Sequence, residues 1–374
     1  MKKMVVREKP FEYLRQRGNN LPYPEDIIRN WYVARAYILF RLKDIAIGPD
    51  STHHLHMVIN GDSPLMLAVL RQAALSSHFI NYKENDTFGQ FSTRNRTVLT
   101  LVTRMETDEV IRVLKKEEHL CNLPDFCHLS VFGELRNEDS WLDIQLQIVH
   151  ERPEESDTLW IEENDILSFV GLKDPEEIFS IDTRKAVFAN RAYELGAVID
   201  NLPAEDIHNA KRYARALDTF QYRLLQSGHT PLIKEDYWSK NQVAVINGLS
   251  SLFCSDCFVL RAAGIRQYAQ DNNISEQSAW EKCCESLSRS EHARWAVEKL
   301  IMGFRPLTNP ERLHYEGLFG KERATFVSSL KTKLQNPAHI DLCSYRDLRR
   351  IDPESLKYDS FLMLGIPVIL TTVK

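Results

Sequence analysis

One segment indicates the fold class of the first half: Val58-Ile59-Asn60-Gly61-Asp62-Ser63-Pro64-Leu65. Its apolar start is typical of a buried strand, residues 61–64 have the composition of a turn, and residues 65–75 are predicted to be helical. A strand that enters a helix through a tight turn is the basic step of α/β proteins. The segment therefore predicts an α/β domain.

The flanking sequence continues this alternation of short apolar runs and helical patterns. We predict strands at residues 54–60, 77–82, 96–103, 128–132, 141–149, 159–161 and 166–170, with helices at 26–42, 65–75 and 107–118. Such alternation favours a parallel sheet with helices on its faces. From residue 182 onward the pattern is helical. Helices or helix pairs are predicted at 184–201, 204–227, 240–264 and 275–302, followed by shorter helices and an apolar tail at 361–373.

Composition restricts the classes of function. The chain has 374 residues, of which 43% are hydrophobic and 26% are charged, and its net charge is −5. This charge argues against a broad nucleic-acid surface. The seven cysteines are odd in number and scattered, and we find neither a signal-peptide pattern nor a run of about 18 apolar residues. We therefore expect a cytoplasmic protein with no membrane span and no nucleic-acid partner.

A second informative segment covers residues 288–304 and combines a helical pattern with clustered polar residues. Glu291, His292 and Trp295 lie three or four positions apart and share adjacent helix faces. A carboxylate, an imidazole and an indole on one patch could bind a flat, polar ligand. The alternative to ligand binding is that His292 and Trp295 have a structural role and pack in the core, as such residues often do.

This segment resembles the ryanodine-receptor-type (RyR) repeat domain, whose hallmark is an acidic residue, His, Trp and then Gly-Trp. Glu291, His292, Trp295 and Gly303 match, and Phe304 stands where the family usually has Trp. Residues 236–265, 341–348 and 365–370 are similar to other parts of the same bacterial family. The resemblance implies a ligand-binding set, which comprises Glu291, His292, Arg294, Trp295, Phe304 and Tyr345.

The segment around Gly61 resembles the nucleotide-binding domain of potassium-transport regulators (RCK, or TrkA-N type), in a form often joined to RyR repeats. Similar strings are residues 58–65, 72–75, 78–81 and 98–102. Only one glycine is present at the turn, and Asp62 would repel a pyrophosphate, so a purely structural domain is the main alternative. Gly61 and Ser63 are the candidate cofactor-binding residues, with Ser63 able to cap the helix or bind an anion.

Together the two resemblances imply an α/β Rossmann-like domain with a parallel sheet, followed by a mainly α-helical RyR-type domain. We expect an N-terminal arm and helix at residues 1–45, the degenerate Rossmann-like domain at 46–180 and the helical region at 181–374. The implied function is a non-catalytic sensor or regulator, in a bacterial signalling or phage-defence setting. It would bind a nucleotide-derived small molecule, with a nucleotide or dinucleotide as the candidate cofactor and a homo-oligomer as the candidate assembly.

Two other classes of function stay open. One is a nucleotide-processing enzyme that uses His292 as its acid and base, with Glu291 orienting it. The other is a ligand-free scaffold subunit. We set aside metal binding by the Cys254 and Cys257 pair, which lies in a helical pattern without a second pair, and by His54 and His56, which have no acidic partner nearby in the sequence.

Overall fold

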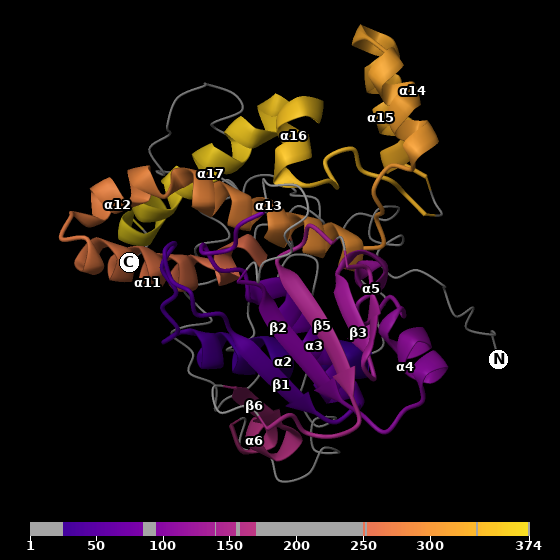
Figure 1. The fold of residues 1–374 in the computed structure, drawn as a ribbon, viewed down its shortest axis with the longest axis vertical. Helices are drawn as coiled ribbons and strands as arrows, with labels where there is room; N and C mark the ends of the chain where they lie inside the picture. Colours follow the sequence, from indigo (N-terminus) through magenta and orange to yellow (C-terminus); the bar gives the residue numbers. More distant parts are fainter. Residues whose placement is uncertain are drawn as a thin grey trace.

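The computed structural model describes residues 25–84, 95–138, 140–154, 158–169, 250, 253–333 and 336–372. In this part of the chain a mixed, mostly parallel sheet with flanking helices is joined to a helical half, as Figure 1 shows. The predicted arm at residues 1–24 and the predicted helices at 184–201 and 204–227 lie outside the described residues, as does the boundary at residue 180.

The described part of the first half contains both helices and strands. They are α2 (Glu25–Leu42), β1 (His56–Asn60), α3 (Pro64–Ser76), β2 (Thr97–Val102), α4 (Thr107–Leu114), α5 (Leu123–Phe126), β3 (His128–Val131), β4 (Glu134–Arg136), β5 (Ile144–Val149), β6 (Leu159–Glu162) and α6 (Glu163–Phe169). The described strands form one sheet in the order β4-β3-β5-β2-β1-β6. All neighbours are parallel except β3 and β4, and β4 was not predicted from the sequence.

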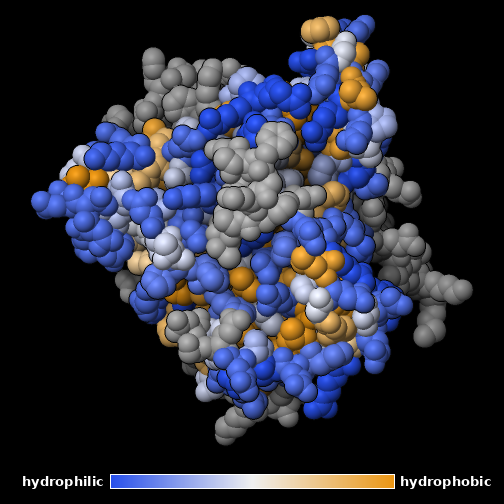
Figure 2. Space-filling view, viewed as in Figure 1, coloured by the Kyte–Doolittle hydropathy of each residue, from blue (hydrophilic) through white to orange (hydrophobic). Residues whose placement is uncertain are grey.

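The helical half contains seven described helices. They are α11 (Phe258–Asp271), α12 (Glu276–Lys282), α13 (Cys284–Ile301), α14 (Asn309–Gly317), α15 (Gly320–Lys331), α16 (Tyr345–Ile351) and α17 (Pro353–Thr372). Residues 361–372 of the apolar tail predicted at 361–373 belong to the long helix α17. The α14–α15 hairpin projects from the body in Figure 1, and Figure 2 shows hydrophobic patches on its surface. Two apolar side chains of this region, Leu313 and Phe319, are 71% and 75% exposed.

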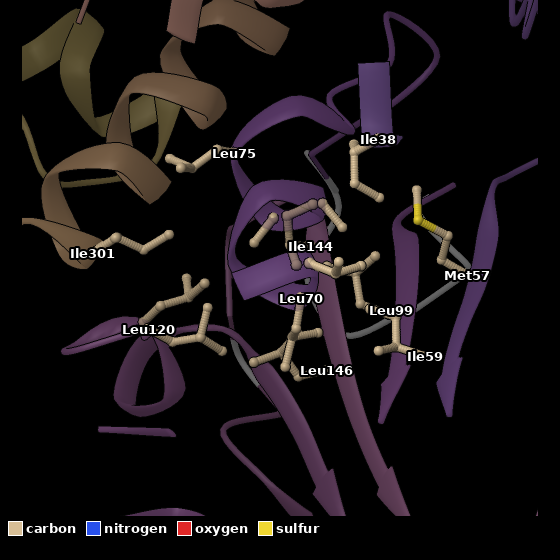
Figure 3. Close-up of a cluster of buried hydrophobic side chains, with 14 of the residues drawn as sticks. Ile38, Met57, Ile59, Leu70, Leu75, Leu99, Leu120, Ile144, Leu146 and Ile301 are labelled. Carbon is tan, nitrogen blue, oxygen red and sulfur yellow. The ribbon is translucent and has the colours of Figure 1, made fainter. Parts of the chain in front are cut away.

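Helix α3 is the centre of the molecule because it is buried on every side. Ser63 caps its first turn, Pro64 occupies the first helical position, and residues 65–76 are all buried. It packs against β1 and β2, against α2 and against α13 of the helical half. Figure 3 shows the result, with Leu70 and Leu75 of α3 among the sheet residues and Ile301 of α13 in the same hydrophobic cluster.

Two strand predictions were wrong. Residues 77–82 form a buried connection without strand structure, since both sides of β2 are already taken by β1 and β5. Side chains satisfy the backbone there: Thr97 Oγ1 donates to the Ser77 carbonyl at 2.6 Å and Ser290 Oγ donates to the His78 carbonyl at 3.1 Å. Residues 166–169 of the strand predicted at 166–170 instead belong to α6, whose first turn carries Glu163 and Asp165.

The same connection joins two hydrophobic clusters. Phe79 packs in the large cluster, which extends from the sheet and α3 into α13, and Ile80 packs in a second cluster formed mainly by α11, α12, α13 and α17. A buried ion pair adds a further link between the halves, because Arg35 of α2 binds Asp256 through two hydrogen bonds of 2.5 and 3.0 Å. The described parts of the two halves therefore share one interior.

Candidate functional site

Helix α13 positions most of the predicted ligand-binding residues. It ends where Gly303 adopts a φ of +82°, a left-handed conformation that glycine accepts without strain. The Gly303 N–H donates to the Leu300 carbonyl at 3.0 Å and the Phe304 N–H donates to the Lys299 carbonyl at 2.9 Å. This turn sends Phe304 back against the body, where it is buried and its carbonyl accepts a hydrogen bond from Asn122.

Glu291 is an internal ion-pair partner. Its carboxylate accepts hydrogen bonds from Arg294 at 2.9 to 3.1 Å and from Arg261 of α11 at 2.8 Å, and all three side chains are buried. Burial alone would raise the pKa of Glu291, but Arg294 and Arg261 outweigh it and lower the pKa to about 2. Glu291 is therefore ionised at neutral pH and already has strong partners.

Arg294 is also buried, and it forms ion pairs inside the protein. Besides Glu291 it binds Glu298 at 2.7 Å, and Glu298 also accepts hydrogen bonds from Lys299 at 2.7 Å and from Ser250 at 3.0 Å. These residues form a buried ion cluster on one side of α13. The cluster, which comprises Arg261, Glu291, Arg294, Glu298 and Lys299, was not foreseen as a unit, although three of its members are spaced i, i+3 and i+7 in the sequence.

His292 faces the other side of α13 and is surrounded by rings. Its imidazole lies 6.0 Å from Trp141, 6.0 Å from Trp295 and 5.8 Å from Tyr345, measured between ring centroids. The interplanar angles to the two indoles are 27° and 23°, so these three rings are nearly parallel. The structure thus brings together predicted residues of α13 and α16 with Trp141, which precedes β5 and was not predicted.

The protonation state of His292 follows from its contacts. Its Nε2 lies 2.9 Å from the carbonyl oxygen of Cys343, which can only accept, so Nε2 carries the proton. Burial lowers the pKa of His292 to about 4, against the smaller opposing effect of that carbonyl. The second nitrogen, Nδ1, lies 3.7 Å from the Asp359 carboxyl of α17. At neutral pH His292 is therefore a neutral imidazole with its lone pair on Nδ1.

Asp359 is a site residue that the sequence analysis missed. Burial raises the pKa of its carboxyl well above the ordinary value, and the nearby Glu291 and Asp341 charges raise it further. The raised pKa favours the protonated form of this carboxyl. The signal in the sequence is an acidic residue just before the apolar tail of the chain, on the helix that packs against α13.

Trp295 continues the row of rings toward the surface. It is partly buried, its indole meets the His339 ring edge-on at 4.8 Å, and His339 in turn meets Phe304 at 6.2 Å. The Lys299 ammonium lies 5.7 Å from the Trp295 ring centroid, within reach of a cation–π contact. We call the rings of Trp141, His292, Trp295, His339 and Phe304 the aromatic row.

Tyr345 is the first residue of α16, and its backbone is hydrogen-bonded to a residue of the first half of the chain. Glu84 accepts hydrogen bonds from the backbone N–H groups of Tyr345 and Arg346, at 2.7 and 3.1 Å. This arrangement places a carboxylate at the helix N-terminus, where it is electrostatically favourable. Arg289 and Arg349 lie 6.0 and 5.5 Å from the Tyr345 ring centroid, so two guanidinium groups border this end of the site.

The candidate cofactor turn lies elsewhere. Figure 1 shows the arrowheads of β1 and β5 pointing away from α13, so Gly61 and Ser63 are at the opposite end of the sheet from His292. Gly61 has a φ of +123°, as the tight turn requires. The Ser63 hydroxyl donates to Glu163 at 2.5 Å and accepts from the Met66 N–H, and Asp62 accepts a hydrogen bond from Thr103. Carboxylates therefore occupy the polar groups that a phosphate would use.

The motifs set aside in the sequence do not form metal sites in the described part of the chain. No group of three or more His, Cys, Asp or Glu residues there could hold an ion. Cys254 and Cys257 are buried, and burial raises the pKa of both thiols. His54 precedes β1 and is exposed, whereas His56 lies in β1 and is buried against Thr100.

Comparisons of the chain with protein-family models, with curated proteins and with solved structures gave no match. Among the helices of the described residues, none combines the length and the apolar character needed to cross a membrane.

Proposed function

We propose that this protein is a non-catalytic sensor or regulator that binds a nucleotide-derived small molecule at the aromatic row. The observation that carries the proposal is the near-parallel stacking of Trp141, His292 and Trp295, with both outer indoles only partly buried. Flat aromatic faces of this kind suit a heteroaromatic base. Near these rings, Lys299 lies beside Trp295, and Arg289 and Arg349 lie beside Tyr345; cations of this kind suit the phosphates of such a ligand.

The contacts of His292 and Glu291 favour binding over catalysis. A general acid–base works best with a pKa near the operating pH, whereas the pKa of His292 is about 4 and its Nε2 proton is held by a backbone carbonyl. Glu291 cannot orient His292, since both of its oxygens are engaged by Arg261 and Arg294. We therefore assign His292 a positioning role between the two indoles.

The proposal also covers the family assignments of the two halves of the chain. A strand, a glycine turn and a capped helix in a mostly parallel sheet support a Rossmann-like first half. We propose that this half is a structural platform without a dinucleotide, because Asp62 and Glu163 occupy the turn. The RyR-type assignment of the second half is supported by the helix–glycine–Phe304 arrangement, and a cytoplasmic regulatory setting is part of this proposal.

A thermal-shift screen with the full chain tests the proposal. The probes are NAD, ADP-ribose, and cyclic mono- and dinucleotides, each compared with ribose 5-phosphate as a control that lacks a base. A bound ligand at about 100 times its dissociation constant adds about 2.7 kcal/mol of stability, which is readily measured. We expect a saturable shift for a base-containing probe and none for the sugar phosphate.

Two tryptophan variants locate the response. Trp295→Ala should abolish the shift, whereas Trp160→Ala, which alters another partly buried tryptophan at β6 beside Arg152, should keep it. Turnover of a probe, lost in His292→Ala, would instead favour the enzyme alternative. The absence of any response across the panel would favour the ligand-free scaffold.

A further inference from the structure

Three buried arginines differ in one respect. Arg35 and Arg294 each hold a carboxylate through Nε and Nη2, the edge of the guanidinium that forms two parallel hydrogen bonds. Arg261 donates only from Nη1, to Glu291 at 2.8 Å. Its Nε and Nη2 atoms are buried and have no hydrogen-bond partner in the structure, although the residue is only 1% exposed.

This arrangement is unusual for a folded protein. Buried polar groups are nearly always hydrogen-bonded, because a donor removed from water without an acceptor destabilises the fold, and the effect is larger for a charged donor. Two adjacent unpartnered donors on one guanidinium edge match the two oxygens of a carboxylate. Arg35 and Arg294 show this pairing within the same protein.

The charges around Arg261 also favour an anion beside its guanidinium group. The buried ion cluster contains three cations, Arg261, Arg294 and Lys299, and two carboxylates, Glu291 and Glu298. Asp359 is the next acidic side chain that interacts with Arg261, but burial raises its pKa well above the ordinary value. Its ionised form is therefore disfavoured, and the described cluster itself contains one more cation than carboxylates.

We propose that the Nε–Nη2 edge of Arg261 is a binding site for a small carboxylate-type anion, of the size of formate, acetate or bicarbonate. A planar anion with two oxygens fits the fork, and its single negative charge balances the cluster. The depth of the site selects a small ion, since the Arg261 side chain is fully buried. The site is separate from the aromatic row and does not depend on the proposed function.

The anion links α11 to α13 through Arg261 and Glu291. Entry requires a local opening of the packed helices, so association is slow and binding is coupled to the stability of the folded state. The expected signature is an anion-specific rise in the unfolding temperature that saturates with concentration. Non-specific salt effects, in contrast, grow with concentration without saturating and are strong for excluded ions such as sulfate.

The experiment compares sodium formate, acetate, chloride and sulfate at one ionic strength with the full chain. We expect formate and acetate to raise the unfolding temperature by a few degrees in a saturable manner, with sulfate giving no specific rise. Arg261→Lys keeps the positive charge but removes the fork, so its formate response should disappear. Arg35→Lys changes a buried arginine whose fork is already occupied, and it should keep the response. A response that is equal in Arg261→Lys and wild type would overturn the proposal.

A readout on the wild-type protein covers the case in which Arg261→Lys does not fold. In ¹⁵N-labelled protein, formate should shift one slowly exchanging arginine Nε–H resonance, with the same midpoint as the thermal response. No shift of any such resonance would overturn the proposal. A formate response that appears only in Asp359→Asn would overturn it as well, because it would identify Asp359 as the internal partner of Arg261.

Discussion

Arg294 and Glu291 lie one turn apart on α13, where the arginine Nε and Nη2 donate to both carboxylate oxygens at 2.9 to 3.1 Å. Both residues are at most 2% exposed. Pairs at this spacing on an exposed helix face contribute only tenths of a kcal/mol, but a buried pair responds differently to the loss of one partner. The reason is that the remaining charge stays buried without compensation.

Glu291→Ala is therefore expected to lower the free energy of unfolding by about 3 to 5 kcal/mol. Arg261 and Arg294 would lose their shared carboxylate in a dry environment. Denaturant unfolding followed by circular dichroism measures the change. The matched control is Glu285→Ala on the same helix, because Glu285 pairs with Arg289 and Arg349 at the surface and should contribute less than about 1 kcal/mol. Equal effects in the two variants would contradict the importance of burial.

His292 should make stability depend on pH below neutrality. Its pKa is about 4 in the folded protein and 6.5 in the unfolded chain, so between these values only the unfolded chain takes up the proton. Its contribution is complete above pH 6.5 and is lost as the pH falls toward 4, up to roughly 3 kcal/mol. The measured quantity is the difference between wild type and His292→Gln across this range. His54→Gln, at an exposed position, should leave the profile unchanged.

Asp341 should have the opposite pH dependence. Burial, followed by the nearby Asp352, raises the pKa of Asp341 to about 6, and its Oδ1 is buried without a hydrogen-bond partner. A raised carboxyl pKa favours folding at low pH and loses that contribution as the pH rises through about 6. Asp341→Asn should therefore stabilise the protein at about pH 8 by about 1 to 2 kcal/mol and by less at about pH 5. The same change at exposed Asp50 serves as the control in these denaturation curves.

Gly264 should not tolerate a side chain. A Cβ at this position in α11 would lie 2.5 Å from the Ile47 carbonyl oxygen, a backbone atom that cannot rotate away. Gly264→Ala should destabilise the protein by about 1 to 3 kcal/mol, as overpacked cores do. At Gly317, the last residue of α14, an added Cβ would meet nothing within 4 Å, so Gly317→Ala should be neutral or slightly stabilising. Thermal unfolding of the two variants would contradict this prediction if their order were reversed.

Local patterns predicted much of the first half correctly. The segment around Gly61 gave β1, the turn and α3, because a short apolar run, a glycine and a capping serine each have a local physical meaning. The strand predicted at 77–82 failed for a non-local reason. Its apolar residues divide between two hydrophobic clusters, and the sheet positions beside β2 were filled by other strands.

The candidate site was predictable only in part. Helical spacing placed Glu291 and His292 next to each other, but it could not reveal that their side chains point to different neighbours. That outcome depends on Arg261 and Asp359, which come from other helices. Trp141 and His339 were missed for the same reason, since no local pattern connects them with α13.

The buried connection at residues 77–82 has a consequence for how this protein can change over evolutionary time. Phe79 and Ile80 are neighbours in the chain but belong to separate hydrophobic clusters, so one short segment serves both. Exchange of either half by recombination would leave the other without its complementary surface. Sequence drift on the two sides of this segment should therefore be correlated, with compensating changes in α3, α11 and α13.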